Sequence, residues 1–305
     1  ANDAIRVNGG DLRCRVVGEG GNLGASQLGR IEAAMAGVAI NTDAVDNSAG
    51  VSSSDMEVNI KIPLIQVVRD GELTMEERND LLASMTDEVA DLVLRDNYEQ
   101  NVLLMNSRAQ SAEMLGVHRR LITWLERRGD LDRDLEFLPD EEELDARARA
   151  GEGLTQPEFS VLMAYAKMAL KDDLAQTSFA EGSWFSTTLA EYFPTAMRER
   201  FRDALEQHPL RAEIIINSVV NSMVNRGGIT FAYRAADETG ATSEQVARAY
   251  AATREIFDLR DFTDAVEALD AKVDTDVQST LYLSFRRLLD RTTRWFVHHR
   301  HDQLD

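Results

Sequence analysis

Four glycines fall within nine residues, VVGEGGNLG (16–24), directly after an apolar run. Glycine turns after a strand allow the backbone to approach a phosphate closely, and this spacing is similar to the dinucleotide-binding fingerprint. Asp43 follows the next apolar run, where such folds place a ribose-binding acid. The match is loose, because the third glycine lies one place late and Asp43 lies 25 residues after Gly18. The glycines therefore fit either a phosphate-binding loop or a tight turn without a ligand.

A second polar stretch, DNSAGVSSSDMEVN (46–59), follows that acid. Ser54 and Glu57 form a capping-box pattern, which predicts that a helix begins at Ser54. A helix N-terminus presents free N–H groups and the positive end of the helix dipole, so it suits a carboxylate. The Ser54 hydroxyl can donate to such a ligand or cap its own helix, and the pattern leaves both readings open.

The segments around these loops predict one βαβ unit. Residues 12–18 and 38–43 are short apolar runs typical of strands, and residues 25–37 carry apolar side chains at helical spacing. Two parallel strands joined by a helix are too few for a stable sheet, so partner strands must come from elsewhere. Cys14 lies in the first run, and we expect its thiol to be buried.

The remainder of the chain has helical periodicity. Thr74 with Glu77, and Thr155 with Glu158, form capping boxes at expected helix starts. Further helices are expected at 194–207, 209–226, 242–258 and 276–300, and the helix at 209–226 is apolar enough to be a core helix. Three histidines near the C-terminus, His298, His299 and His301, fit a cationic helix end better than a metal site.

These patterns predict a mainly α protein, with a partial α/β (Rossmann-like) segment at the N-terminus followed by a large helical domain. We place the domains at 1–72 and 73–305, with a possible further boundary in the charged connector 135–153. The large helical part carries no pattern that we interpret as catalytic.

Composition narrows the class of protein. The 305 residues carry a net charge of −20, which argues against a nucleic-acid partner, because such binding needs a basic surface. No apolar run is long enough to predict a membrane span, and one cysteine cannot form an internal disulfide. We expect a cytoplasmic protein without a metal site. The chain begins with Ala1 and an expected edge strand, so we expect it to be part of a longer polypeptide.

The two linked motifs point to a family. GEGGNLGASQLGRIEAAMAGVAINTDAVDNSAGVSSSDMEVNIKI resembles the end of the cofactor domain of the large bacterial NAD-dependent glutamate dehydrogenases, over roughly residues 14–62. The segment NYEQN (97–101) and the rest of the helical part resemble this family more weakly. The resemblance implies oxidative deamination of L-glutamate to 2-oxoglutarate and ammonium, with NAD as cofactor, in a homo-oligomer. It also implies that the phosphate-binding loop lies upstream and that VVGEGGN lies near the nicotinamide end.

The resemblance also assigns roles to individual residues. Gly20, Gly21, Asn22 and Asn47 would contact the cofactor. Val51 would line the pocket for the substrate side chain, and Ser54 would bind the side-chain carboxylate of glutamate. The sequence departs from the family's usual pattern at two positions. Gly21 stands where smaller family members have alanine, and we expect Pro63 to kink or end its helix.

The family's catalytic lysines and aspartate come from upstream segments, and Lys61, which stands alone before residue 167, matches none of them. We therefore expect no catalytic residue here and no turnover by these residues alone. The alternative is a non-catalytic helical interaction or regulatory module, in which the glycine turns are purely structural. The two hypotheses differ in whether Asn22, Asn47 and Ser54 converge on one cleft.

Overall fold

A computed structural model describes residues 6–21, 23–300 and 303–304, and this part of the chain is mainly helical, as expected. Its first half contains η2 (Gly9–Asp11), α1 (Gln27–Met35), α2 (Asp43–Asp46), α3 (Ser48–Arg69), α4 (Met75–Ser84), α5 (Thr86–Ala109), α6 (Leu115–Arg128) and α7 (Glu141–Ala150). The second half contains α8 (Gln156–Ala175), η3 (Phe179–Glu181), η4 (Ser183–Phe185), α9 (Ser186–Tyr192), α10 (Thr195–Arg198), α11 (Arg202–Glu206), α12 (Arg211–Gly227), α13 (Phe231–Thr239), α14 (Ser243–Ile256), α15 (Leu259–Glu267) and α16 (Thr275–Arg300).

The N-terminal segment contains the expected helix, α1, but no strand is formed within the described residues. A single parallel bridge joins Val16 to Ala39, with hydrogen bonds from Val17 N to Ala39 O (2.9 Å) and from Ala39 N to Arg15 O (2.9 Å). Its small apolar core centres on Ala33, Val38 and Ile40. The Cys14 side chain is exposed, so the expectation of a buried thiol is wrong. Among the residues that the structure describes, no neighbouring strand lies beside Cys14 to cover it.

Two capping boxes form where the sequence places them. The Thr74 hydroxyl accepts from Glu77 N, and the Glu77 carboxylate accepts from Thr74 N, at the start of α4. Thr155 and Glu158 make the reciprocal arrangement at the start of α8. Each motif uses groups only three residues apart, so local sequence is sufficient to fix these two helix starts.

α3 begins at Ser48, six residues before the start that the Ser54–Glu57 pattern predicts. Glu57 instead pairs with Lys61 one turn later, and the Ser54 hydroxyl donates to Val51 O (2.8 Å) inside the helix. The expected capping box is therefore wrong. α2 leads directly into α3 through Asn47, which ends one helix and precedes the other, so helical backbone is already established before Ser54.

Pro63 does not end α3, which continues six residues beyond it to Arg69. Proline has no N–H, so the carbonyl of Asn59 loses its usual donor from residue i+4. The structure supplies a replacement, because His208 Nε2 lies 3.1 Å from Asn59 O. Leu210 N donates to Nδ1 of the same ring (3.0 Å), so the proton of the neutral imidazole is on Nε2, which donates to Asn59.

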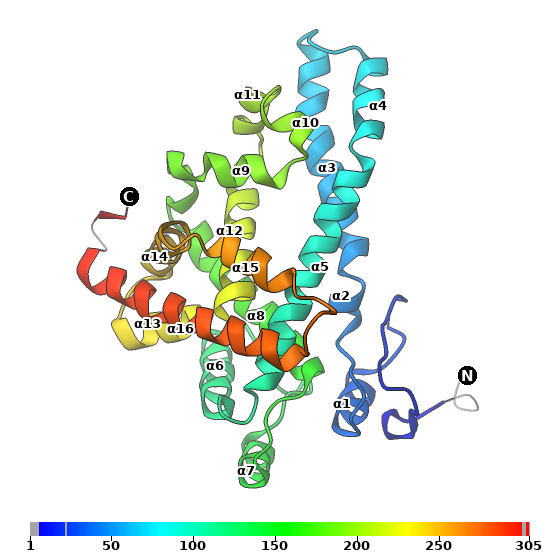
Figure 1. Cartoon of the computed structure of the whole chain (residues 1–305), viewed down its shortest axis with the longest axis vertical. Helices are drawn as coiled ribbons and strands as arrows, with labels where there is room; N and C mark the ends of the chain where they lie inside the picture. Colours follow the sequence, from blue (N-terminus) through cyan, green and yellow to red (C-terminus); the bar gives the residue numbers. More distant parts are fainter. Residues whose placement is uncertain (1–5, 22, 301–302, 305) are drawn as a thin grey trace.

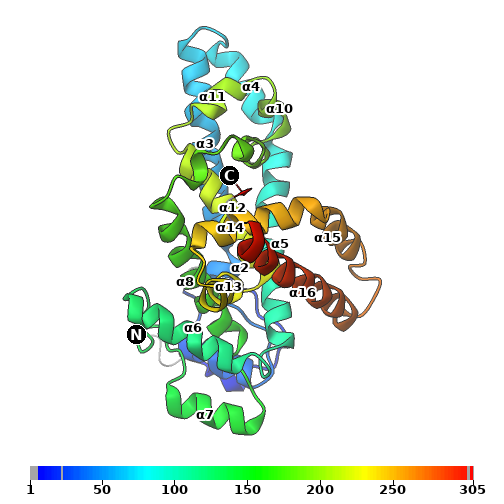
Figure 2. The ribbon, with the colours of Figure 1, turned by 90° about the vertical axis from the view of Figure 1, so that its left-hand side faces the viewer.

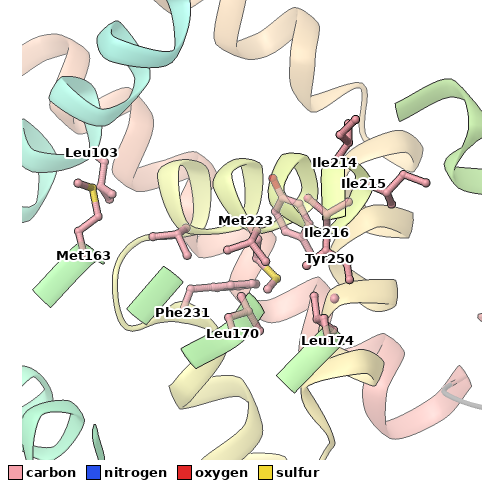
Figure 3. Packing of buried hydrophobic residues seen from close by; sticks show 14 of the residues in the cluster. Leu103, Met163, Leu170, Leu174, Ile214, Ile215, Ile216, Met223, Phe231 and Tyr250 are labelled. Carbon is pink, nitrogen blue, oxygen red and sulfur yellow. The ribbon is translucent and has the colours of Figure 1, made fainter. Parts of the chain in front are cut away.

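The hydrophobic core lies around α12, the helix that composition identifies as the most apolar. Ile215, Val220 and Met223 on α12 are fully buried, and they pack with residues of α8, α13 and α14 (Figure 3). Figures 1 and 2 show α3 running antiparallel to α4 and α5, joined to them by a short turn, and α16 lying across α14. The same core extends from Val45 to Val297, so α3 is packed into the helical body.

Candidate functional site

The glycine loop (residues 18–24) is held against α2 by carboxylates. Glu19 N donates to Asp46 Oδ2 (3.0 Å), and Leu23 N donates to Asp43 Oδ2 (3.1 Å). Both acids belong to one four-residue helix, so the two ends of the loop are fixed to the segment that leads into α3. The Asp43 carboxylate is therefore already hydrogen-bonded to the backbone of the glycine loop.

A buried ion pair lies beneath the loop. Arg30 on α1 donates from Nε (2.8 Å) and from Nη2 (2.6 Å) to the two carboxylate oxygens of Glu19, and Arg30 Nη2 lies 3.3 Å from Asp43. The hydrogen bond to Glu19 raises the pKa of Arg30, so the guanidinium stays charged. The bidentate geometry fixes the loop relative to α1. This pair could not be predicted from the sequence, because a glutamate within a glycine run gives no sign of its partner.

Two asparagines from α5 hold the junction of α2 and α3. Asn97 Nδ2 donates to Val45 O (2.8 Å) and to Ser48 Oγ (2.9 Å). Asn101 accepts a hydrogen bond at Oδ1 from Asn41 Nδ2 (3.0 Å). These contacts connect NYEQN in the helical body to the N-terminal segment. The positions of Asn97 and Asn101 one helical turn apart are the sequence signal that could have indicated a shared face.

The predicted cofactor residues in the loop lie on an open surface. Gly20 and Gly21 are exposed, and no atom lies within 4 Å of the position that a Cβ would take at either residue. Asn22 lies outside the described residues. An exposed backbone without side chains can be approached closely by a ligand, so the loop fits contact with one end of a dinucleotide.

The remaining predicted residues share one face of the first turns of α3. Asn47, Val51 and Ser54 are spaced by four and three residues, which places them in one row along the helix. Val51 is 73% exposed, Ser54 is exposed, and Asn47 is half-buried. The structure thus brings these three together, beside the α2 carboxylates that hold the glycine loop. Whether Asn22 joins them lies outside the described residues.

This arrangement has an open side that can accept a ligand. The row on α3 offers an amide, an apolar side chain and a hydroxyl, and the Asn47 side chain makes no hydrogen bond within the described part of the chain. The N-terminus of α3 lies at Asn47 and Ser48 and contributes the positive end of its dipole. Within the described ranges, no group of three or more His, Cys, Asp or Glu side chains is placed to hold a metal ion.

Comparison with known proteins identifies the class to which this site belongs. Residues 151–305 match the family described as glutamate dehydrogenase, C-terminal, and residues 1–107 match the family described as bacterial NAD-glutamate dehydrogenase, catalytic domain. The chain therefore belongs to the glutamate dehydrogenase C-terminal family, and its first third is similar to the catalytic domain of the bacterial NAD-glutamate dehydrogenases.

Individual relatives agree with this assignment. The chain is 47% identical over 300 residues to the NAD-specific glutamate dehydrogenase of Halomonas elongata, and 98% of the chain is covered. It is 45% identical over 305 residues to that of Pseudomonas aeruginosa, and 45% identical over 300 residues to that of Mycobacterium tuberculosis. The matched part is 19%, 19% and 18% of those proteins respectively, so the chain spans about a fifth of their length.

None of the helices in residues 6–21, 23–300 and 303–304 is long and apolar enough to cross a bilayer.

Proposed function

We propose that this chain is the C-terminal part of a large NAD-dependent glutamate dehydrogenase. The reaction is the oxidative deamination of L-glutamate to 2-oxoglutarate and ammonium, with reduction of NAD, in a cytoplasmic homo-oligomer. The family assignment supports this proposal, together with one structural observation: the glycine loop is fixed by Asp43 and Asp46 beside the exposed face of α3.

We assign the following roles. Residues 1–72 form the end of the dinucleotide-binding domain, in which the bridge at Val16 and Ala39 marks two strands of a Rossmann-like sheet completed by upstream residues. Residues 73–305 form the helical domain that braces it, with a possible further boundary in the connector 135–153. Gly20, Gly21, Asn22 and Asn47 contact the cofactor, which accepts a hydride from the substrate α-carbon when it is bound.

Val51 and Ser54 bind the substrate side chain in this proposal. Val51 contacts the methylene groups of glutamate, and the Ser54 hydroxyl donates to the side-chain carboxylate. Ser54 donates instead to Val51 O in the structure, so ligand binding exchanges a hydrogen bond within the helix for one to a charged acceptor. The acid–base groups belong to the upstream segments, so this chain positions substrate and cofactor without transferring the proton.

Steady-state kinetics of the full-length enzyme test the substrate role. A hydrogen bond to a charged group contributes about 1.5–3 kcal/mol, so Ser54→Ala should raise the KM for glutamate about tenfold or more and change the KM for NAD little. Ser53→Ala is the matched control, because Ser53 is also exposed but lies on another face of α3. Equal effects on the two KM values, or equal effects of the two substitutions, would refute the role.

A further inference from the structure

A cavity of about 190 Å³ lies between the end of α5, the start of α6, the α12–α13 turn and α16. Figure 1 shows α13 beside α16, and the two helices are in contact. Its lining contains three arginines and one carboxylate, and the polar side chains are Ser107, Gln110, His118, Thr230, Arg234, Arg286, Arg287 and Asp290.

Arg286 is the central cation of this cavity, and no carboxylate pairs with it among the described residues. Its Nε donates to Arg226 O (3.0 Å), and its Nη2 lies at the limit of hydrogen bonding to Asn225 O (3.5 Å). Burial, and then the neighbouring charges of Arg226 and Arg234, lower the pKa of Arg286 to about 10. This cation therefore lacks a counter-ion in surroundings that disfavour its charge.

The other charges of the lining leave an excess of positive charge. Arg234 is neutralised by Asp290 (2.9 Å). Arg287 is exposed and makes no ion pair with any described residue. Arg286 and Arg287 thus remain as two unpaired guanidiniums at one cavity, in a chain whose net charge is −20.

The α12–α13 turn and the N-terminus of α13 line the same cavity. Gly228 has φ +106°, a conformation that favours glycine, and a Cβ there would lie 3.6 Å from Arg286 Nη1. Thr230, which is 5% exposed, directly precedes the nine-residue helix α13. The first turn of a helix carries N–H groups without helical acceptors and the positive end of the dipole. α13 therefore adds partial positive charge beside the two arginines.

His118 provides a second, independent sign of a ligand. Its side chain lines the cavity, is 4% exposed and makes no hydrogen bond with the described residues, and its Nδ1 is fully buried. Burial lowers the pKa of His118 to about 4, so the ring is neutral near pH 7 and has one N–H to donate. Buried polar groups in native proteins are usually satisfied, so a ring without a partner in a cavity wall points to a bound ligand.

A larger polar cleft in the helical body provides a contrast. That cleft, of about 440 Å³, is also rich in arginine, but its cations are neutralised within the chain. Arg260 donates to both carboxylate oxygens of Glu191 (2.9 and 2.8 Å), and Arg226 pairs with Glu99 (2.6 Å). An arginine-rich lining is therefore shared by both sites, and the smaller cavity differs from this cleft because no carboxylate of the described residues neutralises its Arg286 and Arg287.

We propose that the cavity between α6, α13 and α16 binds a small oxyanion, a phosphate group, held by Arg286 and Arg287 with the N-terminus of α13 and the His118 ring. The site is separate from the glycine loop, since no element carrying the loop contributes to it. Its volume exceeds the size of one phosphate group, so the phosphate of a small organic molecule fits as well. The proposal does not depend on the dehydrogenase function.

Equilibrium dialysis of the full-length protein against labelled inorganic phosphate tests this site. We expect Arg286→Gln and Arg287→Gln each to weaken one phosphate site at least tenfold. Arg69→Gln is the matched control, because Arg69 is exposed, makes no ion pair within the described residues and loses the same charge. Phosphate bound elsewhere in the protein is the same in all variants, so the difference in bound phosphate between variants reports this site alone.

Two results would overturn the proposal. One is phosphate binding that is the same in Arg287→Gln as in Arg69→Gln. This comparison stands even where Arg286→Gln fails to fold, because Arg287 is exposed and makes no hydrogen bond or ion pair with the described residues. The other is displacement of labelled phosphate by an equal concentration of succinate, which would show a carboxylate site in place of a phosphate site. Loss of one phosphate site in Arg287→Gln, without such displacement, supports the proposal.

Discussion

The hydrogen bond between His208 and Asn59 replaces a helical bond that Pro63 removes from α3. His208 is 4% exposed, and its ring packs against Phe193 at 5.9 Å between centroids. His208→Phe keeps an aromatic ring of similar size but removes both hydrogen bonds of the imidazole. Two backbone groups, the buried Asn59 O and the partly buried Leu210 N, then lose their partners.

The magnitude follows from those two groups. Leaving the buried Asn59 carbonyl unsatisfied costs about 1–3 kcal/mol, and loss of the partly buried bond at Leu210 costs about 1 kcal/mol, so His208→Phe should lower the free energy of unfolding by about 2–4 kcal/mol. Pro63→Ala restores an N–H four residues after Asn59. In that background the Asn59 carbonyl regains a helical donor, so His208→Phe should cost about 1 kcal/mol less. The loss at Leu210 is the same in both backgrounds and cancels.

Urea unfolding of the four proteins of this double-mutant cycle measures the coupling. The cycle isolates the Asn59 bond, since it removes every effect that the two backgrounds share. Effects that add to within about 0.3 kcal/mol would refute the replacement of the helical bond by His208. The result bears on the proposed site, because α3 also carries Val51 and Ser54.

Two further predictions concern buried charge and pH. Glu158 is 1% exposed and binds Arg147 through both carboxylate oxygens (2.7 and 2.8 Å), so Glu158→Ala should lower the free energy of unfolding by about 3 kcal/mol. Glu143→Ala removes the exposed partner of the same arginine and should lower it by less than about 1 kcal/mol. Urea unfolding that gives similar values for the two substitutions would contradict this. The folded-state pKa of His118, about 4, lies below its ordinary value of 6.5, so the unfolded chain takes up the proton first and stability is lost as pH falls from about 6.5 towards 4. Between pH 7 and pH 5, in phosphate-free buffer, the wild type should lose about 2 kcal/mol more than His118→Gln, and equal losses would show that His118 does not cause the effect.

Features set by neighbouring residues could be predicted from the sequence. The capping boxes of Thr74 and Thr155 form as predicted, because each involves groups three residues apart. The apolar composition of α12 predicted its place in the core, since burial of such a surface dominates folding. The family could also be predicted from the sequence, because the residue types and the spacing of the two linked motifs resemble it, and the family comparison agrees.

Features that depend on residues distant in the sequence were decided only by the tertiary structure. The capping pattern at Ser54 was misleading, because the α2–α3 junction, held by Asn97 from α5, starts the helix at Ser48. Pro63 suggested a helix end, but His208, 149 residues from Asn59, satisfies the carbonyl that proline leaves free. The sequence determines which groups can donate or accept a hydrogen bond. The fold alone determines which distant group becomes the partner, because buried polar groups pair with the partner that packing brings near them.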